Sequence, residues 1–273
     1  MKVSVLGSGS GGNATFFEAG GTRLLVDAGF SGRDLARRLA ALKVDADSVD
    51  AIVVTHDHGD HTKGVGIFAR RHGTPVYLTD VTREACGALF RGGETLRSYA
   101  AGRPFPVGGI RVEPFLTVHD AADPVAVAVV DRESELRVGL ATDLGRPTAQ
   151  VRHALSGCDL LILEANHDDV LLQEAPYPMA VKARITSSHG HLSNLEAAAL
   201  ASELFHPRLS GVILAHLSSE SNRPELARRV VEKALARLGF RGHLSVARQN
   251  EPTPILDVRE LRARLEPDQL SLL

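Results

Sequence analysis

The sequence contains no tryptophan, three tyrosines and two cysteines in 273 residues. With so few aromatic rings, a nucleic-acid surface built on stacked aromatic side chains is not expected. Cys86 and Cys158 lie far apart in the sequence, which excludes a disulfide framework. We expect both to be small core residues of a protein in the reducing cytoplasm.

Long apolar runs and a strong excess of charge are also missing. No apolar stretch has the length of a signal peptide or a membrane span, which favours a cytoplasmic location. The formal net charge is −2, so a polyanion would have to be held by local patches or by metal ions. Hydrophobic residues make up 44% of the chain and charged residues 23%, as in ordinary globular proteins.

Short apolar runs typical of β-strands alternate with helical patterns, which predicts an α/β fold of sheets covered by helices. The predicted strands span residues 3–6, 15–18, 23–26, 51–54, 76–78, 110–115, 126–130, 137–141, 160–163, 212–214 and 244–248. The predicted helices span residues 32–42, 62–71, 82–89, 148–155, 194–205, 224–238 and 258–265. Ser31 is placed to cap the first helix, and Pro224 suits the first turn of the sixth.

The glycine-rich stretch GSGSGGN at residues 7–13 lies between two predicted strands, so we interpret it as a structured turn. It is not a dinucleotide-binding fingerprint, because that motif requires a helix where this chain continues with a strand. No linker or repeat interrupts the pattern. We therefore expect a single domain over residues 1–273.

Polar residues follow several of the predicted strands directly. His56 follows AIVVT, Asp143 follows RVGLAT, and His216 follows GVILA, while Asn166 and His167 come just after LLILE. Side chains at the carboxyl ends of neighbouring strands can meet at one edge of a sheet, where α/β folds commonly place their sites.

The segment THDHGDH at residues 55–61 crowds histidines and aspartates together directly behind an apolar run. His56 and His58 can reach one cation, and a turn at Gly59 can direct Asp60 and His61 towards a second. Imidazole and carboxylate together suit Zn²⁺, Mn²⁺ or Fe²⁺. A solvated polar loop is the alternative, but such side chains are rarely crowded for packing. The pattern therefore favours a metal site.

Two metal ions need more ligands than this motif supplies. The candidates are His119 behind the predicted strand 110–115, Asp143 in LATDLG, and His216 in ILAHLSSESN. Asp143 could bridge both ions, because one carboxylate has two oxygens. Each residue alone is weak evidence, whereas the three in this order, each at a strand end, support one another.

The motif H-x-H-x-D-H followed by His, Asp and His resembles the signature of the metallo-β-lactamase superfamily. The resemblance implies an αββα sandwich with a dinuclear site of Zn²⁺ or Mn²⁺ at its edge. It implies that His56, His58 and His119 hold one ion, that Asp60, His61 and His216 hold the other, and that Asp143 bridges them. Asp27 in LLVDAG matches the family's strand-end aspartate, which supports the metal loop from behind. Two such ions with a bridging hydroxide are suited to hydrolysis.

Within the superfamily, the branches differ in what surrounds the common ligands. A secreted β-lactamase would need a signal peptide. The interval between Asp143 and His216 is too short for the large inserted domain of a β-CASP nuclease. The interval between His119 and Asp143 leaves no room for the protruding arm of RNase Z. A glyoxalase II-like thioesterase, or another small-molecule hydrolase, stays open as the alternative, although the segment after His216 contains no tyrosine.

Four further motifs, GSGSGGNA, EANHD, SHGHLSN and AHLSSESN, together resemble the YycJ/WalJ family. That resemblance implies a metal-dependent exonuclease acting on nucleic acid, with DNA favoured over RNA. The family more often has Asn where this chain has Ser221, which affects no expected ligand. A binding role without catalysis is a third hypothesis, which the intact ligand set disfavours. The metal used, the polarity of digestion, the choice between endo- and exonuclease action, and the oligomeric state stay open.

The expected substrate groups lie in these motifs or close to them. Lys182 and Arg184 precede SHGHLSN and could supply positive charge to a phosphate backbone, unless they are merely solvated. His191 comes shortly before a predicted helix start, where an anion is favoured, so we expect it to hold phosphate and to protonate the leaving oxygen. The expected catalytic residues are Asp60 and His191. The expected substrate-binding residues are Asn13, His167, Lys182, Arg184, His191, Ser218 and Asn222.

Overall fold

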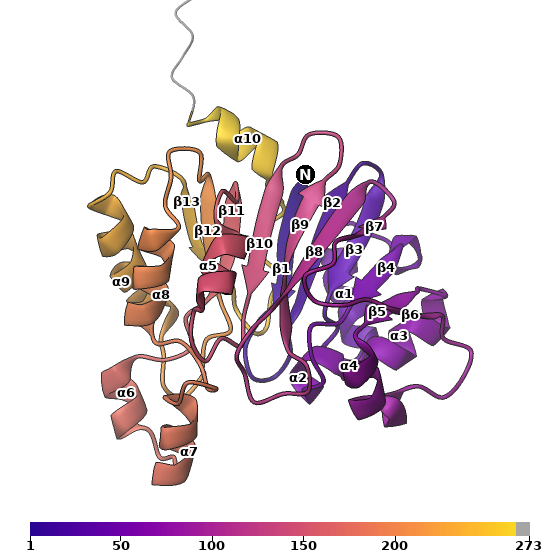
Figure 1. The fold of residues 1–273 in the computed structure, drawn as a ribbon, viewed down its shortest axis with the longest axis horizontal. Helices are drawn as coiled ribbons and strands as arrows, with labels where there is room; N and C mark the ends of the chain where they lie inside the picture. Colours follow the sequence, from indigo (N-terminus) through magenta and orange to yellow (C-terminus); the bar gives the residue numbers. More distant parts are fainter. Residues whose placement is uncertain (266–273) are drawn as a thin grey trace, which may run out of the picture.

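Two seven-stranded sheets pack face to face in the computed structural model, which describes residues 1–265 (Figure 1). Residues 266–273, the end of the predicted domain, lie outside the described residues. The first sheet has the order β14-β1-β2-β3-β4-β5-β6 and the second has the order β13-β12-β11-β10-β9-β8-β7. The first contains β1 (Lys2–Gly7), β2 (Ala14–Ala19), β3 (Thr22–Val26), β4 (Ala51–Val53), β5 (Val76–Leu78), β6 (Leu96–Ser98) and β14 (Leu256–Asp257). The second contains β7 (Phe105–Val107), β8 (Ile110–Leu116), β9 (Val125–Asp131), β10 (Arg137–Ala141), β11 (Leu160–Glu164), β12 (Gly211–Ala215) and β13 (His243–Val246).

The main core lies between the two sheets. Val5 and Phe17 of the first sheet belong to the same buried cluster as Val127, Leu140 and Ile162 of the second. Because side chains alternate between the faces of a strand, the neighbouring positions face outwards. Those outward positions are also apolar, so both outer faces require a covering layer.

Helices supply that layer on both sides. On the outer face of the first sheet, α1 (Gly32–Ala41) and α3 (Val65–His72) share a buried cluster with its strands. On the outer face of the second, α5 (Ala149–Leu155), α8 (Asn194–Glu203) and α9 (Pro224–Ala236) do the same. Figure 1 shows α8 and α9 on one side of the sheets and α3 on the other. The αββα sandwich expected from the sequence is therefore confirmed.

Short elements complete the chain. They are α2 (Gly59–Thr62), α4 (Asp80–Ala85), α6 (Asp169–Glu174), α7 (Met179–Ile185), α10 (Val258–Ala263) and the 3₁₀ turns η1 (Ala46–Ser48) and η2 (Gly87–Leu89). In Figure 1, α6 and α7 project from the lower edge of the sandwich. No helix within residues 1–265 is both long and apolar enough to cross a membrane.

Every predicted strand is present, and the differences concern short or interrupted elements. The predicted helix 62–71 covers the end of α2 and most of α3, and the two helices are separate. Between them, the backbone N–H of Gly64 donates to the carbonyl oxygen of Ala28 at 2.8 Å and not to a residue of α2. The predicted helix 82–89 is α4 followed by η2. The sequence analysis missed β6, β7, β14, α6 and α7, which bury few side chains and therefore show little apolar pattern. Ser31 caps α1 by accepting from the backbone N–H of Asp34, as predicted.

Candidate metal centre

The strand directions bring the polar residues to one edge of the sandwich. Strands β3 and β4 are parallel, as are β10, β11 and β12. Strand β8 runs in the direction of β10, because both are antiparallel to β9. The residues that follow β3, β4, β8, β10 and β12 therefore meet at their common carboxyl edge, as the sequence predicts.

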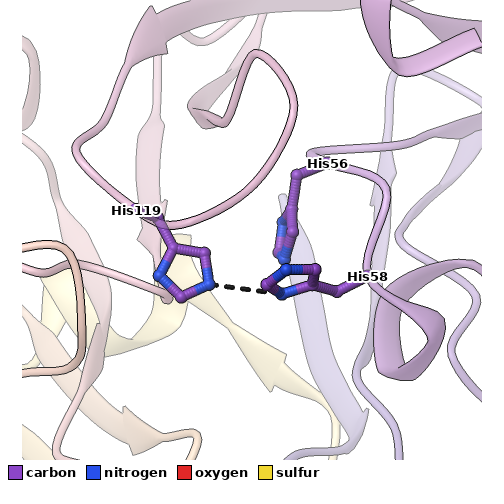
Figure 2. A group of neighbouring side chains, drawn as sticks. All are labelled: His56, His58 and His119. Atoms are coloured by element: carbon purple, nitrogen blue, oxygen red, sulfur yellow. Dashed lines mark hydrogen bonds between the residues drawn. The ribbon is translucent and has the colours of Figure 1, made fainter. Parts of the chain in front are cut away.

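The first group of possible ligands consists of His56, His58 and His119 (Figure 2). Their ligating nitrogens all lie within 4.8 Å of one another. Nδ1 of His58 and Nε2 of His119 are 3.3 Å apart. His56 and His58 come from the loop behind β4 in the first sheet, and His119 follows β8 in the second. A cation placed here would be held by both sheets.

The second group consists of Asp60, His61 and His216. Oδ2 of Asp60 lies 3.7 Å from Nε2 of His61 and 3.5 Å from Nε2 of His216. Asp143 lies between the two groups. Its Oδ2 is 3.1 Å from Nε2 of His61, and its Oδ1 is 3.6 Å from Nε2 of His119. The seven residues expected from the sequence are thus brought together as two groups with one carboxylate between them.

Three buried polar atoms at this centre make no acceptable hydrogen bond within the described residues: Nε2 of His56, Nε2 of His216 and Oδ2 of Asp143. A buried polar atom without a partner is costly unless it is bound to an ion or another polar group. All three belong to residues of the clusters that could hold a metal ion. A divalent cation fits this donor set of imidazole and carboxylate.

The ring tautomers of the histidines provide a second test of the fit. Nδ1 of His61 donates to Asp27, and Nδ1 of His119 lies 3.1 Å from the carbonyl oxygen of His189. Nδ1 of His216 donates to Glu164. Since carbonyl and carboxylate oxygens only accept, each of these rings carries a proton on Nδ1, which leaves Nε2 as the nitrogen that can bind a metal ion.

The other two rings follow the same rule. Thr55 donates its hydroxyl proton to Asp27, so Nδ1 of His56 donates to the Thr55 oxygen and Nε2 keeps its lone pair. Nε2 of His58 lies 3.2 Å from the carbonyl oxygen of Asp120, which leaves the lone pair on Nδ1. In its neutral form, each of the five histidines therefore directs the lone pair of one nitrogen towards the centre, and metal binding requires that form.

Asp27 holds the loop of the THDHGDH motif through hydrogen bonds, the supporting role expected for it. Its carboxylate accepts from the backbone N–H of Thr55 at 2.8 Å, from the Thr55 hydroxyl at 2.9 Å and from Nδ1 of His61 at 2.8 Å. Asp27, Asp143 and His216 adopt positive φ angles of 61°, 58° and 54°. Such backbone conformations are unusual for residues other than glycine and often occur at functional sites.

Glu164 is the important residue to which the sequence analysis assigned no role. It ends β11 and is fully buried, and its carboxylate accepts from Nδ1 of His191 at 2.7 Å and from Nδ1 of His216 at 2.9 Å. The same carboxylate accepts from the backbone N–H groups of Leu144 and Leu192. A glutamate closing the apolar run LLILE was the available signal, since a carboxylate is rarely buried without partners.

The charges of the centre are strongly coupled. Burial disfavours the ionised form of Asp143, but His216 and His61 hold the pKa of its carboxyl well below the usual range. Burial also opposes protonation of His61, yet Asp143 and Asp27 raise the pKa of that ring well above its ordinary value. Burial, together with the neighbouring His61, lowers the pKa of His56 well below its ordinary value. A carboxylate whose ionised form is favoured thus lies among several imidazoles.

A cavity of about 310 Å³ opens onto this centre. Arg184, His191 and Ser218 line it, together with Tyr177 and Val181. Figure 1 places α7, which carries Val181 and Arg184, below this edge of the sandwich. Three of the expected substrate residues therefore reach the cavity.

The other four expected substrate residues do not line this cavity. Asn13 is buried and places its Nδ2 3.2 Å from Oδ2 of Asp60 and 3.1 Å from Nε2 of His61. The ammonium group of Lys182 contacts the carbonyl oxygen of Gln173. His167 is buried, and the amide of Asn222 donates to the carbonyl oxygens of Ala165 and Asn166.

Comparisons with known proteins identify the family. A model of the beta-lactamase superfamily domain matches residues 22–216. Over 242 residues the chain is 35% identical to the exodeoxyribonuclease YycJ of Bacillus anthracis, covering 88% of this chain and 91% of that protein. The chain belongs to the metallo-β-lactamase superfamily. Within the superfamily it is YycJ-like. It is also 34% identical to the exodeoxyribonuclease WalJ of Streptococcus pneumoniae, covering 86% of this chain and 88% of that protein.

Solved structures of the superfamily share the fold. The metallo-β-lactamase fold protein YhfI of Bacillus subtilis matches with a TM-score of 0.71 and 22% identity, covering 92% of this chain and 98% of that one. The short form of human tRNase Z matches with a TM-score of 0.65 and 18% identity, covering 94% of this chain and 100% of that one. At these identities the likeness concerns the fold alone.

Proposed function

We propose that this protein is a metal-dependent exonuclease that hydrolyses phosphodiester bonds in DNA. The observation that carries the proposal is the gathering of six possible ligand residues around the carboxylate of Asp143, which lines an open cavity. The relatives named exodeoxyribonuclease match over most of the chain and support DNA as the substrate. We further propose that the protein acts in the cytoplasm and that residues 1–273 form one domain.

The proposed ligand assignment follows the two groups. His56, His58 and His119 would hold one divalent cation, and Asp60, His61 and His216 would hold a second, with Asp143 shared between them. The ions would be Zn²⁺ or Mn²⁺, since both accept imidazole and carboxylate. When bound, such a pair activates water and neutralises the charge that develops on phosphate.

The protein's own groups would position the substrate. Nδ1 of His191 donates to the buried Glu164, so the ring is fixed and Nε2 is left available. From its place in the cavity wall, His191 would donate to a phosphate oxygen and pass a proton to the leaving oxygen. Arg184 lies on the same wall and would pair with the backbone phosphates. Asn13 would hold Asp60 and His61 in place, and Ser218 would contact the strand at the cavity rim.

A panel of end-labelled substrates tests this function. Single- and double-stranded DNA and RNA, labelled at the 5′ or 3′ end, are incubated with Mn²⁺ or Zn²⁺, beside a glutathione thioester. We expect stepwise digestion of DNA and no efficient cleavage of the thioester. Thioester cleavage without nuclease activity would favour a glyoxalase II-like enzyme, which the named relatives do not support.

The metal content of the same preparation tests the ligand assignment. Elemental analysis should find two ions per chain in wild-type protein purified without chelator. Asp143→Ala should lose activity and at least one ion, because its carboxylate lies close to a residue of each group and would be shared by both ions. Wild-type protein that holds one ion or none, even after Mn²⁺ or Zn²⁺ is added, would contradict the dinuclear assignment.

A further inference from the structure

A second cavity, of about 470 Å³, adjoins the metal cavity. Ser10 and Ser218 line both cavities, so the two are neighbours along one surface. The loop behind β12 and the start of α9 form one side of the second cavity, and the glycine-rich turn behind β1 forms another. A strand that lies in the metal cavity would therefore pass the second cavity on its way out.

The two cavities differ in charge. Asp60, Asp120 and Asp143 line the metal cavity, as suits cations. Among residues 1–265, no carboxylate residue lines the second cavity, whereas Arg223 and Arg248 do. The second cavity is therefore suited to an anion.

In the described part of the chain, neither arginine is held in a close ion pair, so both can bind an anion. The guanidinium of Arg223 donates to the carbonyl oxygens of Asn222 and Ser219, and no carboxylate among residues 1–265 forms an ion pair with it. The guanidinium of Arg248 approaches Glu225 at 3.9 Å and Glu251 at 3.7 Å. The side chains of Arg248, Glu225 and Glu251 are all more than half exposed. Such distant, exposed ion pairs contribute little to stability.

Hydrogen bonds fix the glycine-rich turn that lines the second cavity. Gln249 accepts from the backbone N–H of Gly11 at 2.7 Å and donates to the carbonyl oxygen of Gly12 at 2.9 Å. Gly9 has a φ of 141°, a backbone conformation that favours glycine over other residues. The hydroxyl of Ser8 accepts from the backbone N–H of His216 at 2.8 Å. A residue that lines the second cavity is thus hydrogen-bonded to the backbone of a candidate metal ligand.

We propose that the second cavity binds a phosphate of the same DNA strand, adjacent to the phosphate that is hydrolysed. This inference rests on the proposed nuclease function and adds a subsite to it. Arginine side chains, with serine hydroxyls and backbone N–H groups, are the usual ligands of backbone phosphates, and they act independently of base sequence. The subsite would fix the distance between the strand and the metal centre, so that successive nucleotides are presented in the same register.

The test compares a substrate that reaches the second cavity with one that does not. An oligodeoxynucleotide has neighbouring phosphates, whereas bis(p-nitrophenyl) phosphate has a single phosphodiester. For Arg223→Ala/Arg248→Ala, we expect kcat/KM on the oligonucleotide to fall at least about tenfold, as for loss of charged hydrogen bonds. Hydrolysis of the small diester should not change. Arg229→Ala is the matched control, since Arg229 is an exposed residue of α9 that does not line the cavity.

A second measurement removes the charge from the substrate instead. A methylphosphonate placed at the linkage next to the scissile one is neutral, so it should slow the wild-type enzyme but slow the double variant little further. Binding of unmodified single-stranded DNA is measured at several salt concentrations for wild-type protein and for the double variant. In the double variant, the slope of log binding constant against log salt should be smaller by about 0.7 for each phosphate contact that is lost.

Several results would overturn the subsite. They are an equal loss of activity on both substrates, unchanged oligonucleotide kinetics in the double variant, or additive effects of the variant and the methylphosphonate. If wild-type protein cleaves no phosphodiester at all, the proposed function itself fails. If it cleaves the oligonucleotide but not the small diester, the methylphosphonate measurement alone decides.

Discussion

Two buried carboxylates orient the histidines from opposite sides of the centre. Asp27 holds His61, and Glu164 holds both His191 and His216. Each fixes a ring tautomer by accepting from Nδ1, which directs the lone pair of Nε2 away from the carboxylate. Residues that act through a metal ligand in this way commonly change metal affinity by about 10–100-fold when they are replaced.

Glu164→Gln tests this positioning role. The amide keeps the size of the side chain but places an N–H₂ group where one of the carboxylate oxygens accepts. We expect metal affinity, measured by competition with a chelator, to fall by about 10–100-fold, with a parallel loss of activity at limiting metal. Excess metal should restore part of the activity. Glu232→Gln, at an exposed position of α9, is the control. Wild-type metal affinity in Glu164→Gln would contradict the role.

His191→Ala separates a substrate group from a metal ligand. The seven other residues account for both groups of ligands, so we expect full metal occupancy by elemental analysis. Turnover should fall by about 10²–10⁴-fold, which is typical for loss of a proton-transfer group. Loss of metal from the variant would make His191 a ligand. Near-normal turnover with full metal would leave it as a structural residue.

At the scale of elements, close backbone packing fixes the motif loop against its neighbours. A Cβ on Gly29 would lie 1.7 Å from the carbonyl oxygen of Asp60 and 2.7 Å from the backbone nitrogen of Asn13. That nitrogen donates to the same carbonyl oxygen at 2.7 Å. The loop behind β3, the glycine-rich turn and the start of α2 therefore meet without room for a side chain.

Gly29→Ala should displace Asp60. We expect the free energy of unfolding to fall by at least about 1–3 kcal/mol, as in other overpacked sites. The occupancy of the second ion should fall more than that of the first, because Asp60 belongs to the second group. Denaturant unfolding and elemental analysis measure the two effects. Gly87→Ala is the control, because a Cβ there meets nothing within 4 Å. Unchanged stability and metal content would show that the loop can shift without cost.

Helix α7 joins the cavity wall to a loop that carries a metal ligand. Nε of Arg184 donates to Oδ2 of Asp120 at 2.5 Å, and the carbonyl oxygen of Asp120 faces Nε2 of His58. The Arg184 side chain is 67% exposed, so this ion pair itself contributes little stability. Its exposed guanidinium is available for phosphate.

Arg184→Ala should therefore weaken DNA binding and leave the fold intact. We expect the slope of log binding constant against log salt to fall by about 0.7–0.9 for the one phosphate contact that is lost. Lys182→Ala should have a smaller effect, since its ammonium group contacts a backbone carbonyl and does not line the cavity. Equal effects of the two changes would indicate a diffuse basic surface.

At the scale of the whole molecule, the proposed metal ions join the two sheets. His56, His58, Asp60 and His61 follow a strand of the first sheet, whereas His119, Asp143 and His216 follow strands of the second. Each group of ligands contains residues from both sheets. Metal binding should therefore stabilise the sandwich as a whole, because the unfolded chain cannot assemble these ligands.

Removal of metal with a chelator should lower Tm, and added Mn²⁺ or Zn²⁺ should restore it. Free metal at one hundred times its Kd adds about 2.7 kcal/mol to stability, which corresponds to several degrees in a chain of this size. Differential scanning calorimetry measures the shift, and Asp143→Asn should show a smaller one. If chelation removes the metal and Tm does not change, the ions do not hold the sheets together.

The sequence by itself predicted the candidate ligands and determined most of the fold. The histidines and aspartates of the THDHGDH motif are close together in the sequence, so the motif indicates a metal site without knowledge of the fold. The alternation of apolar strands and amphipathic helices predicted every longer element, because burial of an apolar face imposes a period on the sequence. The positions of His56, His119, Asp143 and His216 at strand ends predicted that they would meet. The missed elements bury few side chains, as in β6, β14 and α7, so they leave little apolar pattern in the sequence.

Only the tertiary structure decided how groups distant in sequence act on one another. Nothing local in LLILE shows that Glu164 accepts from His191 and His216, because that contact depends on the parallel pairing of β11 with β12 and on the path of the chain before α8. The second cavity likewise combines the turn behind β1 with the start of α9 and the segment behind β13. Such contacts are set by the packing of whole layers, which fixes distances that sequence separation does not contain.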